Sequence, residues 1–143
     1  MIHLARKETL SLVFLVLLDR LLKMSIENPL FSERFLGWRF FALERHHNFG
    51  VAFNIPIPLW IVIPLTLFFL TTLFVWVKNI DNHRANIGFF MIFVGALSNA
   101  FDRVTYGYTI DYLRVVNAII NIADILVVAG MIILVSKQVS AKK

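Results

Sequence analysis

Four runs of apolar residues alternate with shorter polar segments along the chain. They cover about residues 10–26, 57–77, 85–103 and 115–135, and the second run is nearly free of charged residues. An α-helix of about 20 apolar residues is long enough to span the hydrocarbon core of a bilayer. The pattern therefore predicts an all-α membrane protein with four transmembrane helices. No linker rich in Pro, Gly or Ser divides residues 1–143, so we expect a single domain.

The second half of the first run carries three charged residues, Asp19, Arg20 and Lys23. The run also lacks the small-residue cleavage pattern of a secretory signal peptide, so we interpret it as a retained helix. Asp19 and Lys23 are four positions apart with the acid first, which is the favourable order for an ion pair on a helix. We expect this pair to stabilise the helix rather than to act in catalysis.

The segment between the first two runs has a different character. Its middle, FLGWRFFALERHHNFGVAF, mixes aromatic residues with the charges of Arg39, Glu44 and Arg45. These charges are costly in hydrocarbon, so short strands at the membrane surface fit better than another span. His46 and His47 are adjacent, but no acid or third ligand stands at helical spacing from them. We therefore expect solvated or headgroup-facing histidines and no metal site.

Composition agrees with a membrane protein and excludes several other classes. The chain is 59% hydrophobic, against about 45–50% in a soluble domain. Its net charge is +5, but the basic residues are scattered, which favours membrane lipids as partners and not nucleic acid. The absence of cysteine excludes disulfides, thiolate metal sites and a cysteine nucleophile.

The distribution of Lys and Arg predicts the orientation. Seven lie in the two tails and the loop between the second and third runs, and five lie in the two longer opposite loops. Positive charge concentrates in cytoplasmic segments, so both termini are expected in the cytoplasm. The polar residues near the outer ends of the helices would then collect toward the outer leaflet.

The segment of residues 95–124 carries the polar residues that are hardest to explain as packing. They are Asn99, Asp102, Arg103, Asp111, Asn121 and Asp124. Asn117, Asn121 and Asp124 have the spacing of one stripe on the predicted fourth helix. Gly88 and Gly95 would share one face of the third helix and allow close packing, helped by Ala96 and Ser98.

The two acids of this segment suggest a chemistry. Asp111 and Asp124 can approach each other across a short connection, and two close carboxylates share a proton. The charged one can then activate water while the protonated one polarises a carbonyl, as in aspartic proteases. Spacing alone leaves two alternatives open. Polar residues also hold helices together in membranes, and a buried acid also serves ion or proton translocation.

Five motifs, in order, resemble those of the bacterial lipoprotein signal peptidases (signal peptidase II). DRLLK at residues 19–23 resembles D-Q-x-x-K, and NFGVAF at 48–53 resembles N-x-G-x-A-F. GALSNAFDR at 95–103 resembles G-A-x-G-N-x-x-D-R. TIDY at 109–112 resembles V-V-D-F, and NIAD at 121–124 resembles N-V-A-D. The likeness extends over nearly the whole chain.

The resemblance implies a membrane aspartyl endopeptidase of the bacterial cytoplasmic (inner) membrane. Its substrate would be a prolipoprotein that carries diacylglycerol on its lipobox cysteine, cleaved just before that cysteine without metal or cofactor. Asp111 and Asp124 would form the catalytic dyad, and residues 31–53 a small β-cradle on the outer face. The residues that would support the site or bind substrate are Asn48, Asn99, Arg103 and Asn121. Those with structural roles would be Asp19, Lys23, Gly50, Gly95, Asp102 and Ala123.

The chain departs from the family pattern at a few positions. Arg20 replaces the usual Gln, Ser98 replaces a glycine, and Val94 stands where a second glycine is common. The interval from Asp111 to Asp124 is also short, which would leave the dyad less covered. We expect a monomer. The alternatives are a four-helix carrier that uses Asp124 as its titratable group, and a protein that binds lipidated signal peptides without cutting them.

Overall fold

The structure is a computed structural model, and it describes residues 2–30, 34–35, 41–51, 55, 57–80 and 82–141. Within these residues the chain forms four α-helices and one four-stranded sheet. The helices are α1 (Arg6–Glu27), α2 (Leu59–Lys78), α3 (His83–Tyr106) and α4 (Ile122–Ala141). The strands are β1 (Arg34–Phe35), β2 (Phe41–Asn48), β3 (Thr109–Val115) and β4 (Ala118–Ile120).

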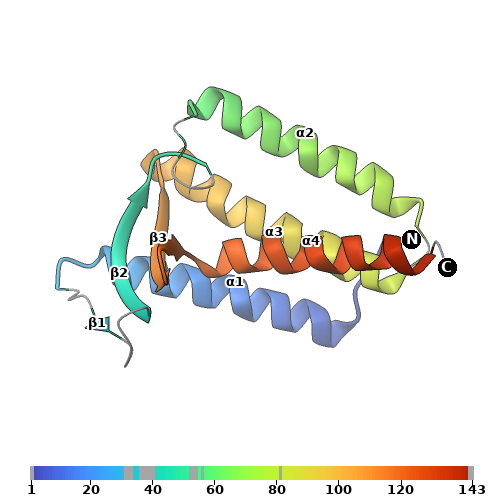
Figure 1. Cartoon of the computed structure of the whole chain (residues 1–143), viewed down its shortest axis with the longest axis horizontal. Helices are drawn as coiled ribbons and strands as arrows, with labels where there is room; N and C mark the ends of the chain where they lie inside the picture. The colour runs from blue at the N-terminus through green and yellow to red at the C-terminus, as the bar shows by residue number, and fades with distance from the viewer. Residues whose placement is uncertain are drawn as a thin grey trace.

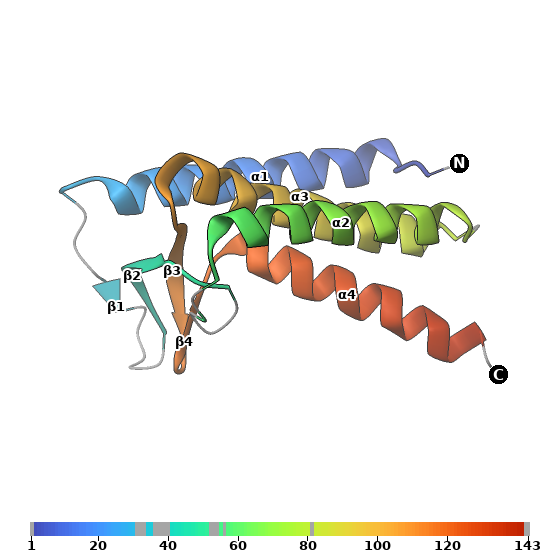
Figure 2. The same cartoon turned by 90° about the horizontal axis from the view of Figure 1, so that it is seen from above.

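The helices lie side by side, and the sheet is at one end of them, as Figure 1 shows. The N- and C-terminal ends of the described chain both lie at the opposite end. Seen from above in Figure 2, the strands lie beyond the ends of α2 and α4, while α1 runs alongside them. α3 packs on α4 along its length and also contacts α1 and α2, so it is the central helix of the bundle.

Glycines allow the close approach of α3 and α4. A Cβ added to Gly88 would lie 2.9 Å from the carbonyl oxygen of Gly130, and one added to Gly95 would lie 2.5 Å from that of Ala123. Both distances are too short for a real side chain, so the two backbones touch directly at these points. The prediction that Gly88 and Gly95 share a packing face is confirmed.

The sheet joins two segments that are far apart in the sequence. Its order is β1-β2-β3-β4, and every neighbouring pair is antiparallel. β2 pairs with β3 so that His46 is opposite Asp111 and Asn48 is opposite Thr109. The guanidinium of Arg114 donates two hydrogen bonds to Glu44, at 2.5 and 2.7 Å, and holds the two strands together.

The fourth helix begins later than predicted. α4 starts at Ile122, whereas the predicted span began at residue 115, and residues 115–121 belong to the hairpin of β3 and β4. The predicted helical stripe is therefore wrong, because Asn117 lies in the hairpin turn and Asn121 precedes the helix. The residues of β3 pair with β2, and those of β4 pair back with β3, so this β-branched and aromatic segment forms a hairpin instead of the start of a helix.

The other predicted boundaries lie close to the observed ones. The bounds of α1, α2 and α3 differ from those of the predicted runs by a few residues at each end. The predicted cradle over residues 31–53 contains β1 and β2, but residues 31–33, 36–40 and 52–54 lie outside the described part of the chain. The sheet also includes β3 and β4, which the sequence analysis did not assign to it.

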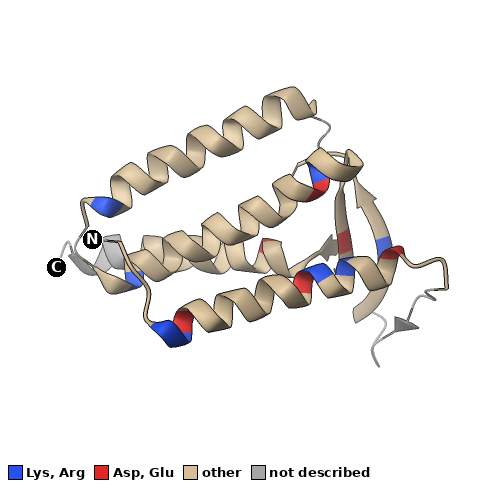
Figure 3. Cartoon of the chain, turned by 180° about the vertical axis from the view of Figure 1, so that it is seen from behind, with Lys and Arg blue, Asp and Glu red and all other residues tan. Residues whose placement is uncertain are grey.

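Two of the described helices are long and apolar enough to cross a membrane, α2 and α3. The apolar part of α4, Ile122–Ser136, is shorter. Figure 3 shows Lys, Arg, Asp and Glu near the two ends of the helices, with long uncharged sections between them. The outside of the bundle is correspondingly apolar: Trp60 and Phe68 of α2 are 75% and 70% exposed.

Candidate active site

Asn121 connects the two carboxylates that the sequence analysis singled out. Its side-chain amide donates to Asp111 Oδ1 at 2.6 Å, and its backbone N–H donates to Asp124 Oδ2 at 3.2 Å. Asp111 comes from β3 and Asp124 from the first turn of α4. The structure therefore brings both aspartates to one place, where the sheet meets the helices.

Local structure fixes the orientation of Asp124. Asn121 is the N-cap of α4, and its Oδ1 accepts the backbone N–H of Asp124 at 2.8 Å. The Asp124 carboxylate accepts the N–H of Asn121 in return. This reciprocal pattern is a capping box, which places a carboxylate at the positive end of a helix.

Two further asparagines complete the contacts of the carboxylates. Asn99 of α3 donates to Asp124 Oδ1 at 2.8 Å, and Asn48 of β2 donates to Asp111 Oδ2 at 3.0 Å. Each aspartate thus accepts hydrogen bonds from two different segments of the chain. Amide donors of this kind hold a carboxylate in one orientation without protonating it.

Arg103 contacts the backbone beside the site. Its guanidinium donates to the carbonyl oxygen of Gly50 at 3.0 Å, and the N–H of Gly50 donates to Asn48 Oδ1 at 3.0 Å. Arg103 therefore holds the turn after β2, and that turn orients the asparagine that contacts Asp111. Asn48 and Gly50 of one motif and Arg103 of another thus lie in one chain of contacts.

A cluster of buried charges lies beneath the site. Lys23 Nζ is 3.0 Å from Asp19 and 2.7 Å from Asp102, and Arg20 is 2.6 Å from Asp102. Lys23 also donates to Asn99 Oδ1 at 3.2 Å, so the cluster continues directly to the site. Two acids and two bases balance each other, which is the condition for burying such groups.

Sequence reasoning missed two members of this cluster. Ser98 donates to Asp19 Oδ2 at 2.7 Å, and the Tyr112 hydroxyl donates to Asp19 Oδ1 at 3.0 Å. Ser98 was recognised only as a small residue, and Tyr112 only as part of a motif. The signal for Tyr112 was the strand-like composition of TIDYLRV, which indicates a β-strand and hence opposite faces for Asp111 and Tyr112.

The environment of Asp111 changes its acidity. The side chain is 1% exposed. Burial raises the pKa of Asp111 from its ordinary value of 3.8 to about 7, and the negative charge of Asp124 acts in the same direction. The hydrogen bonds from Asn48 and Asn121 oppose this shift. Asp111 is thus a carboxyl group that holds a proton near neutral pH.

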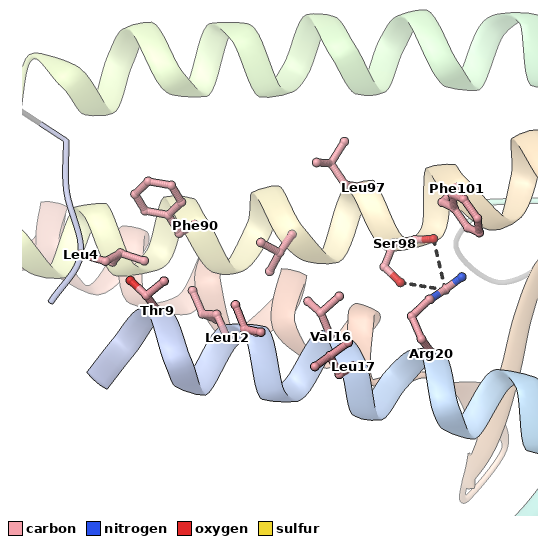
Figure 4. Close-up of a pocket in the computed structure, with 12 residues that line it drawn as sticks. Leu4, Thr9, Leu12, Val16, Leu17, Arg20, Phe90, Leu97, Ser98 and Phe101 are labelled. Carbon is pink, nitrogen blue, oxygen red and sulfur yellow. Dashed lines mark hydrogen bonds between the residues drawn. The ribbon is translucent and has the colours of Figure 1, made fainter. Parts of the chain in front are cut away.

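A large groove lies elsewhere on the bundle, between α1 and α3. It has a volume of about 640 Å³ and is lined mainly by apolar side chains, with Arg20 and Ser98 near one end, as Figure 4 shows. Neither Asp111 nor Asp124 lines it. The candidate active site is therefore the cluster at the junction of sheet and helices, not this groove.

Metal ligands do not gather in the part of the chain that the structure describes. No group of three or more His, Cys, Asp or Glu side chains there could hold a metal ion. His47 lies 2.8 Å from Glu27 and stacks on Tyr108. The absence of a metal requirement stays a prediction, which a cleavage assay with a chelator tests.

Helices capped by a small sheet, with two linked carboxylates at the junction, define a class of membrane enzyme. A bacterial membrane enzyme solved by the in meso method at 2.3 Å resolution has the same fold, with a TM-score of 0.85. The two chains are 24% identical, over 96% of this chain and 90% of the other. A second such enzyme, solved at 1.9 Å, gives a TM-score of 0.78 at 25% identity, with 92% of each chain covered.

Sequence comparisons identify the family. The sequence model of the signal peptidase (SPase) II family matches residues 11–140. The lipoprotein signal peptidase of Brucella ovis is 34% identical over 142 residues, covering 87% of this chain and 88% of that protein. That of Allorhizobium ampelinum is 31% identical over 131 residues, covering 85% and 80%. The chain belongs to the signal peptidase II family and is a bacterial membrane protein.

Proposed function

We propose that the chain cleaves diacylglyceryl-modified prolipoproteins just before their lipidated cysteine, with Asp111 and Asp124 as its catalytic pair. Family membership already makes it an aspartic signal peptidase that removes signal peptides from prolipoproteins. The observation that carries the finer proposal is the bridge of Asn121 between the two carboxylates. The carrier alternative is not favoured, because the family and the relatives are peptidases.

The proposed mechanism assigns different roles to the two acids. Asp124 is proposed as the ionised partner, because its carboxylate lies at the positive end of α4 and accepts the backbone N–H of Asn121 and the side-chain N–H of Asn99 of α3. It removes a proton from a water molecule, which attacks the scissile carbonyl carbon. Asp111 holds its proton near neutral pH and donates it toward the carbonyl oxygen. Collapse of the tetrahedral intermediate breaks the C–N bond, and the proton held by Asp124 passes to the leaving amine.

Four helices are proposed to cross the membrane, with both termini in the cytoplasm. Both ends of the described chain lie at the end of the bundle opposite the sheet (Figures 1 and 2), which supports an even number of crossings. The bias of Lys and Arg toward the terminal side supports a cytoplasmic location for it. The aspartate pair then lies toward the outer leaflet.

The depth of the pair supports a lipid-modified substrate. The carboxylates lie where the apolar helices end and the sheet begins, near the membrane surface in the proposed orientation. Acyl chains attached to the substrate would anchor the adjoining peptide bond at that depth. We also propose that the protein acts as a monomer in contact with membrane lipids.

The proposal is tested with purified protein in detergent and a diacylglyceryl-modified lipobox precursor, with EDTA present. The wild type should cut before the modified cysteine, and Asp111→Asn and Asp124→Asn should each lose roughly 10²–10⁴-fold in rate. Glu8→Gln is the matched control, because it removes one negative charge where α1 begins, next to His83. It should cleave like the wild type.

Three outcomes would contradict parts of the proposal. A folded wild type that binds the modified precursor without cutting it would leave only the signal-peptide-binding alternative. Equal cleavage of a precursor that lacks the lipid would remove the proposed substrate preference. Inhibition by EDTA, reversed by added zinc, would contradict the expected metal independence.

A further inference from the structure

Tyr112 lies next to Asp111 but faces the other way. Consecutive residues of a strand point to opposite faces of the sheet, so Asp111 faces Asn48 and Asn121 while Tyr112 faces α1. Tyr112 is 1% exposed. Its hydroxyl donates to Asp19 and accepts the backbone N–H of Ile122 at 3.1 Å. One buried hydroxyl thus connects β3, α1 and α4.

The contact with Ile122 concerns the helix turn that carries Asp124. The first N–H groups of a helix have no partner within the helix, and other groups must satisfy them. Asn121 accepts the N–H of Asp124, and Tyr112 accepts that of Ile122, the first residue of α4. Tyr112 is therefore a cap supplied by the strand that bears the other carboxylate.

Asp19, which accepts the hydrogen bond of the Tyr112 hydroxyl, is itself held by several contacts. Asp19 also contacts Ser98 and Lys23, and Arg20 donates to Ser98 Oγ at 2.8 Å, the contact visible in Figure 4. Arg20 and Ser98 are departures from the family pattern, and Tyr112 stands where the quoted motif has Phe. All three departing side chains meet at Asp19.

We infer that Tyr112 is a positioning residue of the peptidase, whose hydroxyl fixes the first turn of α4, and with it Asp124, relative to Asp111. The inference rests on the proposed catalytic role of the two aspartates. Without the hydroxyl, the N–H of Ile122 and one oxygen of Asp19 lose their partner, and the turn is no longer tied to β3. Proton sharing by two carboxylates depends on their separation, so catalysis slows while substrate binding is unchanged.

The charges around Asp111 make the pH dependence of cleavage a second measurement of the role of Tyr112. Asp124 of α4 and Lys23 of α1 act on it directly, Arg103 of α3 lies near both acids, and His46 of β2 is opposite in register. A Tyr112→Phe substitution keeps all of these groups. It lets Asp124 move away from Asp111, so Asp111 loses its proton more readily.

The test compares Tyr112→Phe with Tyr106→Phe in the cleavage assay over a range of pH. Tyr106 is 47% exposed at the end of α3, so its hydroxyl is the matched control. Tyr112→Phe should lower kcat roughly 3- to 10-fold, the effect of one lost hydrogen bond, and leave KM unchanged. The alkaline limb of its pH–rate profile should move to lower pH, and Tyr106→Phe should match the wild type.

The results separate the inference from the proposed function. An inactive, folded wild type would overturn the proposed function. An active wild type with Tyr112→Phe unchanged in kcat and pH profile would overturn the positioning role, whatever happens to thermal stability. If Tyr112→Phe does not fold, the pH profile of Ser98→Ala, which loosens Asp19 from the other side, decides in its place: an unchanged profile overturns the inference and a lowered alkaline limb supports it.

Discussion

Gly95 lies directly against the carbonyl oxygen of Ala123, one residue before Asp124. A Cβ at Gly95 would stand 2.5 Å from that oxygen and 3.0 Å from Val127. Gly95→Ala should therefore push the first turn of α4 away from α3 and separate Asp124 from Asn99. We expect overpacking to lower the free energy of unfolding by roughly 1–3 kcal/mol. The cleavage rate of the folded variant should also fall below that of the wild type.

Gly107→Ala is the control for this prediction. Gly107 has a φ of 85°, and a Cβ there would meet nothing within 4 Å. The substitution should cost about 1 kcal/mol through backbone strain and leave the kcat of the folded protein unchanged. Thermal unfolding in detergent and the cleavage rate measure both effects. Equal activity of Gly95→Ala and Gly107→Ala would show that close helix contact is not needed for the site.

Asn121→Ala should impair both stability and catalysis. The substitution removes the N-cap of α4, which costs about 1 kcal/mol, and removes the amide that contacts Asp111. Asn79→Ala is the matched control, because Asn79 is an exposed asparagine at the end of α2 whose hydrogen bonds within the described residues go to the local backbone. Cleavage should fall at least tenfold more in Asn121→Ala. Equal losses in the two variants would argue against a role for the bridge.

Lys23→Met should destabilise the protein strongly. Asp19 and Asp102 are both about 1% exposed or less. Without Lys23, Arg20 is the one positive charge left in the described cluster to balance these two carboxylates. Removing one partner of a buried ion pair costs about 3–5 kcal/mol. Lys78→Met, at the exposed end of α2, should change stability by less than about 0.5 kcal/mol. Similar unfolding temperatures for the two variants would contradict the prediction.

Cleavage should decrease as the pH rises through about 7. Burial and Asp124 raise the pKa of Asp111 to about 7, and the proposed mechanism needs the proton on that group. A profile of kcat/KM between pH 5 and pH 9 measures the effect. A rate that stays constant to pH 9 would contradict the assignment of the proton to Asp111.

The same group predicts a pH dependence of stability. An acid with a raised pKa binds its proton more tightly in the folded state, so its contribution is complete below about pH 4 and is lost as the pH rises to about 7. Asparagine does not ionise, so Asp111→Asn should remove this loss of stability at higher pH. At pH 8 the variant should therefore be inactive yet unfold at a higher temperature than the wild type, whereas at pH 4 the two should unfold alike.

The helices were predictable because their signal is long and apolar. The charge-poor run that became α2 and the spacing of Gly88 and Gly95 in α3 each depend on residues close in sequence. The motifs also named the residues that meet at the site, including Asn48 and Arg103. Their contacts join segments 50 or more positions apart, so composition and spacing alone could not establish them.

The hairpin of β3 and β4 was not predicted, for a physical reason. Its apolar residues continue almost without a break into α4, and periodicity does not separate a buried strand from a helix in so short a run. Pairing with β2 decides between them, and that pairing is long-range. The helical stripe through Asn117 failed at this point, and with it the position of Tyr112 on a strand face was missed.

The order of the site's residues along the chain has a consequence for biosynthesis. Asn48, Asn99 and Asp111 all precede Asp124, which reaches them only when α4 has packed on α3. A chain still being synthesised, with only α1, α2 and α3 formed, holds one carboxylate of the pair and lacks Asn121, which contacts it. With Asp111 and Asp124 as the proposed catalytic pair, the nascent chain cannot cleave its substrate, and activity begins only when α4 has packed on α3.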